Sequence, residues 1–109
     1  MAETERLTLS GDTFVAYDFA VFPIEANFHR VAAVYVVTRR TGRGGADEHE
    51  IVYVGETERL PEHFRDHPKA ACFAQHSADS VGVLRQESPT SRVETIKDLI
   101  GQYRPPCND

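Results

Sequence analysis

Residues 31–55, VAAVYVVTRRTGRGGADEHEIVYVG, contain two β-rich runs separated by a polar, glycine-containing stretch. The first run, 31–38, is apolar over the length of a strand, which is typical of a central strand covered on both faces. The second run, 50–55, has the same β-branched and aromatic character. Two such runs joined by a short polar loop over 41–48 are most simply an antiparallel pair of strands.

The sequence before this pair predicts one further strand. The sequence after it predicts two short helices, a strand and a closing helix, in that order. Aromatic and β-branched residues mark the strands, and the spacing of apolar residues together with prolines marks the helices. The predicted elements are a strand over 13–19, a connection over 23–29, a short helix from Pro61 that ends at Pro68, a second short helix over 69–76, a strand over 81–84 and a closing helix over 88–103. This order predicts a small α+β domain with a mainly antiparallel sheet.

Composition limits the chain to one globular domain. It has 109 residues, of which 40% are hydrophobic and 27% charged, as is ordinary for a soluble protein. No apolar run approaches the roughly 18 residues of a membrane span, and the acidic start MAETE lacks the apolar core of a secretory signal. We therefore expect a cytoplasmic protein without a membrane partner, in which Cys72 and Cys107 are reduced thiols.

The charge balance argues against a protein that coats nucleic acid through bulk charge. Seventeen acidic residues outnumber 12 basic ones, which leaves a net charge of −5, whereas bulk binding relies on basic residues that neutralise phosphates. Arginines are nevertheless concentrated in residues 30–43, where no acid occurs. This segment predicts a local anion-binding edge that includes Arg39 and Arg40; a solvated hairpin rim is the alternative.

Five short motifs follow one another along roughly residues 31–109, about three quarters of the chain. They are Ala33-Val34-Tyr35, Tyr53-Val54-Gly55-Glu56-Thr57, Phe64-x-x-His67, Asp98-Leu99-Ile100 and Tyr103-x-Pro105-Pro106-Cys107-Asn108. In this order they resemble the GIY-YIG nuclease superfamily. The resemblance implies a domain over 31–109 with a mainly antiparallel three-stranded central sheet flanked by helices. Residues 1–30 would then form an N-terminal extension that adds one strand.

The resemblance also implies hydrolysis of a DNA phosphodiester with one divalent cation, Mg²⁺ or Mn²⁺. In the family a tyrosine of the first motif helps to activate water, an arginine stabilises the phosphate, and a glutamate on the last helix holds the metal. The matching catalytic candidates are Tyr35, Tyr53, His63 and His67. The candidate nucleic-acid contacts are Gly55 and Asn108 from the motifs, Arg39 and Arg40 from the arginine-rich segment, and Arg59, four residues before His63.

Two positions depart from the family pattern, and both weaken the case for catalysis. His63 occupies the arginine position, and histidine is only partly cationic at neutral pH. Ile96 occupies the position of the metal-binding glutamate, and isoleucine cannot bind a cation. The remaining metal candidates are Glu56 and Glu94. Glu94 lies about 200° around the helix from position 96 and also matches a capping box with Ser91, so a structural role for Glu94 is the favoured interpretation.

The sequence thus predicts a nucleic-acid-binding domain, with DNA preferred over RNA, whose metal-dependent hydrolysis is weak or lost. Two alternatives stay open: a DNA endonuclease active with Mg²⁺ or Mn²⁺ through altered ligands, and a protein-interaction module on a pseudonuclease fold. If hydrolysis is lost, no cofactor is expected. The i, i+4 pairs His63/His67 and Cys72/His76 also suit Zn²⁺, but no CxxC motif accompanies them, and structural roles are favoured.

Overall fold

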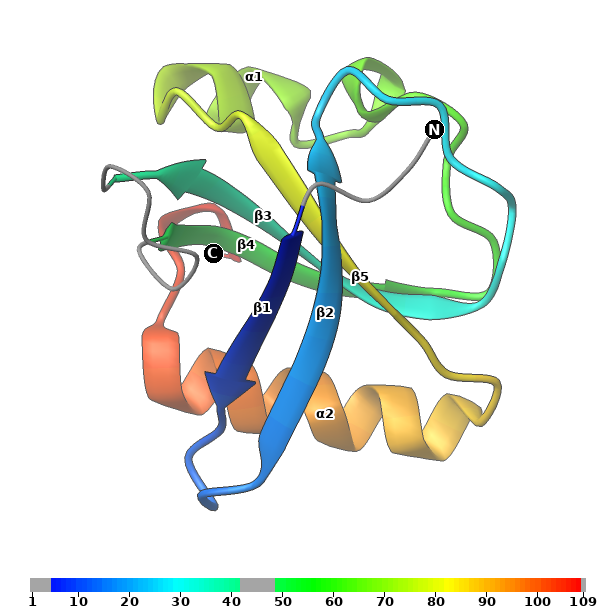
Figure 1. Cartoon of the computed structure of the whole chain (residues 1–109), viewed down its shortest axis with the longest axis vertical. Coiled ribbons are helices and arrows are strands. Elements are labelled where there is room, and N and C mark those ends of the chain that lie inside the picture. The colour runs from blue at the N-terminus through cyan, green and yellow to red at the C-terminus, as the bar shows by residue number, and fades with distance from the viewer. Residues whose placement is uncertain (1–4, 42–48, 109) are drawn as a thin grey trace.

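An antiparallel sheet forms the middle of the molecule in the computed structural model, which describes residues 5–41 and 49–108 (Figure 1). Within these residues the sheet has five strands in the order β1-β2-β5-β3-β4. Their bounds are β1 Glu5–Ser10, β2 Ala16–Pro23, β3 Ala33–Arg40, β4 His49–Thr57 and β5 Ser80–Arg85. The predicted strand pair is β3–β4, which pairs antiparallel from Ala33↔Thr57 to Arg40↔His49. The loop predicted between them lies outside the described residues from position 42 to 48.

The α+β class is confirmed, but the number of strands is larger than predicted. Residues 1–30 contribute a hairpin of two strands, β1 and β2, instead of one. In β1 the buried side chains of Leu7 and Leu9 alternate with exposed Arg6 and Thr8, and Leu7 lies opposite Phe19 of β2. The missed strand has only six residues, too few for its alternation to stand out beside an acidic terminus.

The two faces of the sheet carry separate apolar clusters because successive strand residues point to opposite sides. Val34 and Val36 of β3 pack in one cluster with Leu99 of helix α2, Pro89–Tyr103. Tyr35 and Val37 pack in the other, which includes residues from helix α1, Ala70–Gln75, and from the 3-10 turns η1, Phe64–Asp66, and η2, Pro106–Asn108. Figure 1 shows α1 and α2 on opposite sides of the sheet. Side chains that point toward α2 are therefore separated from Tyr35 by the sheet.

The segment between β4 and β5 is less helical than predicted. The helix expected from Pro61 is reduced to the single turn η1. His67, which precedes Pro68, has extended backbone angles (φ −70°, ψ 143°), as expected for a residue before proline. The second predicted helix is confirmed as α1, one residue shorter at each end.

Helix α2 starts and ends at recognisable capping residues. Ser88 is the N-cap, its hydroxyl oxygen accepts a hydrogen bond from the Ser91 N–H at 3.2 Å, and Pro89 follows in the first turn. The helix over 88–103 is therefore confirmed, whereas the capping box proposed for Ser91 and Glu94 is wrong because the helix begins earlier. Across the described ranges no helix is both long and apolar enough to cross a membrane.

A disulfide joins Cys72 of α1 to Cys107 of η2, with 6.0 Å between the two Cα atoms. The prediction of reduced thiols is therefore wrong, and the cytoplasmic location loses this support. Cysteines 35 positions apart carry no local sign of pairing. They meet because α1 and η2 belong to the same apolar cluster.

Candidate functional site

Tyr35, Tyr53 and His67, three of the four catalytic candidates, lie together in one cluster. Tyr35 projects from β3, Tyr53 from the neighbouring strand β4, and His67 from the chain just after η1. The Tyr35 hydroxyl lies 2.7 Å from His67 Nε2. The ring centroids of Tyr35 and Tyr53 are 6.0 Å apart, and those of Tyr53 and His67 are 5.3 Å apart. Tyr35 is only 5% exposed, while Tyr53 and His67 are partly accessible.

The hydrogen bonds of His67 fix where its proton lies. Its Nδ1 accepts a hydrogen bond from the Lys69 backbone N–H at 2.9 Å. The neutral ring therefore carries its proton on Nε2 and donates it to the Tyr35 oxygen. Burial lowers the pKa of His67, and the positive charge of Lys69 lowers it further. His67 is thus a neutral donor at neutral pH.

Tyr35 keeps its proton because its surroundings disfavour a phenolate. Burial raises the pKa of Tyr35 well above its ordinary value, and the charge and side-chain hydrogen bond of Tyr53 and the charge of Glu56 raise it further. A tyrosine can act as a general base only if its hydroxyl is deprotonated near the working pH. The Tyr35 hydroxyl stays protonated there. The cluster is therefore a neutral set of hydrogen-bonding groups, suited to positioning a ligand more than to removing a proton.

Gly55 makes the close packing of the two tyrosines possible. It lies opposite Tyr35 in the β3–β4 register. A Cβ atom at this position would lie 2.6 Å from both Cζ and the hydroxyl oxygen of Tyr35, and 2.8 Å from Cε2 of Tyr53. The residue predicted as a nucleic-acid contact thus has a structural reason of its own to lack a side chain.

Arg59 and His63 line the same hollow, although the helix on which their spacing argument relied does not form over 59–63. The hollow has a volume of about 310 Å³ and is lined by Arg30, Arg59, Leu60, Pro61, Glu62, His63 and Asp66. His63 is the N-cap of η1, and Phe64, the next residue, stacks on His67 with 5.8 Å between centroids and 7° between planes. η1 therefore connects the two groups, because its N-cap His63 lines the hollow and its C-cap His67 belongs to the tyrosine–histidine cluster.

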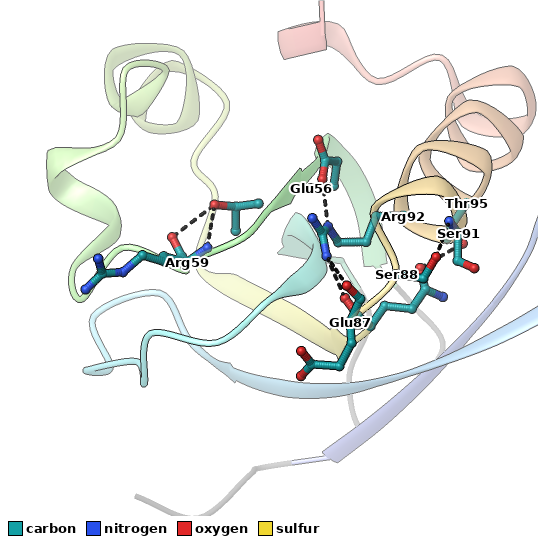
Figure 2. A network of polar contacts seen from close by, with 9 residues as sticks. Glu56, Arg59, Glu87, Ser88, Ser91, Arg92 and Thr95 are labelled. Atoms are coloured by element: carbon teal, nitrogen blue, oxygen red, sulfur yellow. Dashed lines mark hydrogen bonds and ion pairs between the residues drawn. The ribbon is translucent and has the colours of Figure 1, made fainter.

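Glu56 is held by a buried arginine that the sequence did not single out. The Arg92 Nε donates to Glu56 Oε1 at 2.8 Å, and its Nη1 donates to the carbonyl oxygens of Gln86 and Glu87, both at 3.0 Å (Figure 2). Arg92 is 2% exposed. Figure 2 shows that the Arg59 side chain points away from this pair. Arg92 was missed because an arginine in an amphipathic helix normally faces solvent.

The carboxylates of the described residues do not fit a Mg²⁺ or Mn²⁺ ion beside Tyr35. Such an ion takes several oxygen ligands, but Glu56 is paired with Arg92. Ile96 packs against the cluster on the α2 face, opposite Tyr35. Glu94 is exposed and lines a hollow with Asp12, Tyr17 and Asp98. No hydrolytic step is therefore assigned to a metal at this site.

The remaining predicted contacts lie apart from the hollow. Arg39 forms an ion pair with Glu50 at 3.1 Å, and Arg40 follows it at the end of β3 distant from Tyr35 and Arg59. Asn108 uses its side-chain amide to bond the main chain of Val54, donating to the carbonyl and accepting from the N–H, both at 2.8 Å. Asn108 thus attaches η2 to β4.

Comparisons of this chain with models of known protein families, with curated proteins and with solved structures found no significant match.

Proposed function

We propose that this chain is a divergent GIY-YIG-like domain that binds nucleic acid, DNA in preference to RNA, with weak or lost hydrolysis. The observation that carries the proposal is the hollow shared by Arg30, Arg59 and His63, which η1 connects to the cluster of Tyr35, Tyr53 and His67. A guanidinium presents a planar fork of donors that matches a phosphate. The partly exposed rings of Tyr53 and His67 offer a surface on which a base or sugar packs.

Three features support the loss of hydrolysis. The Tyr35 hydroxyl is buried and keeps its proton, Glu56 is neutralised by Arg92, and position 96 is an isoleucine. Metal-assisted cleavage of a phosphodiester needs an ion held by carboxylate oxygens. The preference for DNA follows from the motif resemblance and belongs to this proposal. So does the cytoplasmic location, which no longer has the support of reduced cysteines.

The binding proposal is tested by fluorescence anisotropy with a short labelled DNA duplex. We expect affinity to fall as salt rises. The Arg59→Ala/His63→Ala variant should bind about tenfold more weakly, and the slope of log affinity against log salt should fall by about one. Lys97→Ala, which removes one positive charge from the outer side of α2, is the matched control and should bind nearly as the wild type does. Equal loss in both variants would contradict the assignment of the hollow.

Plasmid nicking separates the proposal from the active-nuclease alternative. With Mg²⁺ or Mn²⁺ we expect the wild-type protein to leave supercoiled plasmid intact. Robust nicking that disappears in Tyr35→Phe would establish an active endonuclease instead.

A protein-interaction module is the second candidate, and the β1–β2 turn favours it. Phe14 is 89% exposed there, and the neighbouring Val15 is 49% exposed. An exposed aromatic side chain beside an aliphatic one is common at protein-binding surfaces. Absence of measurable duplex binding at low salt would favour this function over nucleic-acid binding.

A further inference from the structure

Cys72, His76 and Cys107 bring two sulfur atoms and one ring nitrogen within 4.8 Å of one another. Across the residues that the structure describes, no other group of three histidine, cysteine or acidic side chains gathers its ligand atoms so closely. Cys72 lies on α1, His76 is the C-cap of the same helix, and Cys107 lies on η2. These are the ligand types that Zn²⁺ prefers.

The end of α1 is fixed by hydrogen bonds that do not involve the disulfide. Ser77 has a left-handed backbone (φ 57°), its N–H donates to the Ala74 carbonyl at 3.0 Å, and the Ala78 N–H donates to the Phe73 carbonyl at 2.9 Å. This is the Schellman pattern of a helix end. It holds His76 one turn after Cys72.

Cys107 is positioned from the other side by its own anchors. The Asn108 side chain bonds the main chain of Val54 twice, and the Asn108 N–H donates to the Pro105 carbonyl at 3.2 Å. Cys107 itself is 1% exposed. The two elements that carry the sulfur atoms therefore have anchors besides the S–S bond.

The His76 ring is available as a ligand. The residue is half-buried, and its imidazole forms no hydrogen bond with the other residues that the structure describes. Polar groups in such surroundings normally have a partner. Two adjacent sulfur atoms and an unpaired ring nitrogen together resemble an incomplete ligand set.

We propose that the reduced form of this chain binds Zn²⁺ through Cys72, His76 and Cys107, and that the disulfide is its metal-free form. A dithiol reductant supplies two electrons and two protons, so that the S–S bond breaks, two thiols form and the reductant becomes a disulfide. Zn²⁺ then displaces the two thiol protons and binds the two thiolates and the imidazole. Ligand atoms around one tetrahedral ion lie about 3.5–4 Å apart. The three atoms here all lie within 4.8 Å of one another while the S–S bond is intact, so the two sulfur atoms have only to separate when it breaks. Water or a further donor completes the coordination.

Co²⁺ provides a spectroscopic test with the intact chain. The protein is reduced, freed of reductant under anaerobic conditions and titrated with Co²⁺. We expect one ion per chain, thiolate-to-metal charge-transfer absorption and the visible bands of a tetrahedral site, all removed by added Zn²⁺. His76→Gln should weaken binding by at least about tenfold. His29→Gln, which changes an exposed histidine outside the three proposed ligands, should leave binding unchanged.

Several outcomes would overturn the proposal. The first is that the reduced wild-type protein shows no charge-transfer band with Co²⁺. The second is that the oxidised protein, or reduced His76→Gln, binds Co²⁺ as tightly as the reduced wild type. Circular dichroism follows the fold throughout, with Cys72→Ser/Cys107→Ser as the thiol-free reference, which should bind no Co²⁺. A reduced chain that is unfolded and does not regain its native spectrum on addition of Zn²⁺ would also overturn the assignment.

Discussion

At Gly55 the main chain of β4 passes directly beside the ring of Tyr35. Gly55→Ala would place a Cβ 2.6 Å from two atoms of that ring, so the strand or the ring has to move. Overpacking of this kind lowers stability by about 1–3 kcal/mol. We expect Gly55→Ala to lower the free energy of unfolding by this amount in urea denaturation.

The matched control is Gly101→Ala in α2. A Cβ there would lie 3.5 Å from its nearest neighbour, Asp12 Cβ, which is an ordinary contact. Alanine also favours the helix by about 1 kcal/mol over glycine. The two substitutions should therefore change stability in opposite directions, and a loss of similar size in both would contradict the role given to Gly55.

His67 makes stability depend on pH in a defined direction. Its pKa in the folded protein is lowered, first by burial and then by Lys69, whereas in the unfolded chain it is about 6.5. The unfolded chain therefore binds more protons between these two pKa values. The contribution of neutral His67 is fully present above pH about 6.5 and is lost as the pH falls through the folded pKa.

The corresponding measurement compares urea midpoints at about pH 7.5 and about pH 5, which lie on either side of the pKa of about 6.5 for a histidine in the unfolded chain. We expect the wild type to lose more stability on acidification than His67→Gln does. His63→Gln is the histidine control and should keep the wild-type dependence. A His67→Gln profile parallel to the wild type would remove His67 as the titrating group.

On the scale of elements, Arg92 connects three parts of the chain. From α2 it reaches Glu56 on β4 and the two carbonyls that precede the helix. Removing one partner of a buried ion pair is strongly destabilising, by about 3–5 kcal/mol. Because Glu56 is 30% exposed, we expect Arg92→Ala to lower the free energy of unfolding by about 3 kcal/mol, at the lower end of that range.

A double-mutant cycle with Glu56→Gln distinguishes the ion pair from the packing of the arginine stem. We expect Glu56→Gln alone to have the smaller effect, since Arg92 keeps both carbonyl partners. The coupling between the two substitutions should be about 1 kcal/mol or more. Strictly additive effects would show that Arg92 stabilises the fold through its packing and its carbonyl hydrogen bonds and not through the ion pair.

Considered as a whole, the fold is predictable where one element carries its own pattern. The apolar run of β3 predicted that strand within a few residues. The helical spacing of apolar residues and the Ser88–Pro89 start did the same for α2. Strand β1 was missed because its six residues become a strand only when paired with β2. The helix expected at Pro61 was shortened to η1 because neighbouring prolines restrict the backbone.

In the candidate site, too, some contacts were predictable from local motifs and others were not. Tyr35, Tyr53 and His67 could be placed together because each belongs to a short motif on its own element. The Arg92–Glu56 pair and the Cys72–Cys107 disulfide join residues 36 and 35 positions apart, respectively. Such contacts depend on how the faces of the sheet are covered, and no local pattern encodes that.

The disulfide acts on the molecule as a whole because its closed loop includes α1, β5 and α2. For a separation of 35 residues, the chain-entropy estimate of its stabilisation is about 4 kcal/mol. We expect Cys72→Ser/Cys107→Ser to lower the free energy of unfolding by about 2–4 kcal/mol in buffer containing a chelator. Reduction of the wild type under the same conditions should have a similar effect, because both remove the same constraint from the unfolded chain. Unchanged urea midpoints in both samples would contradict this account, because they would show that the disulfide does not restrict the unfolded chain.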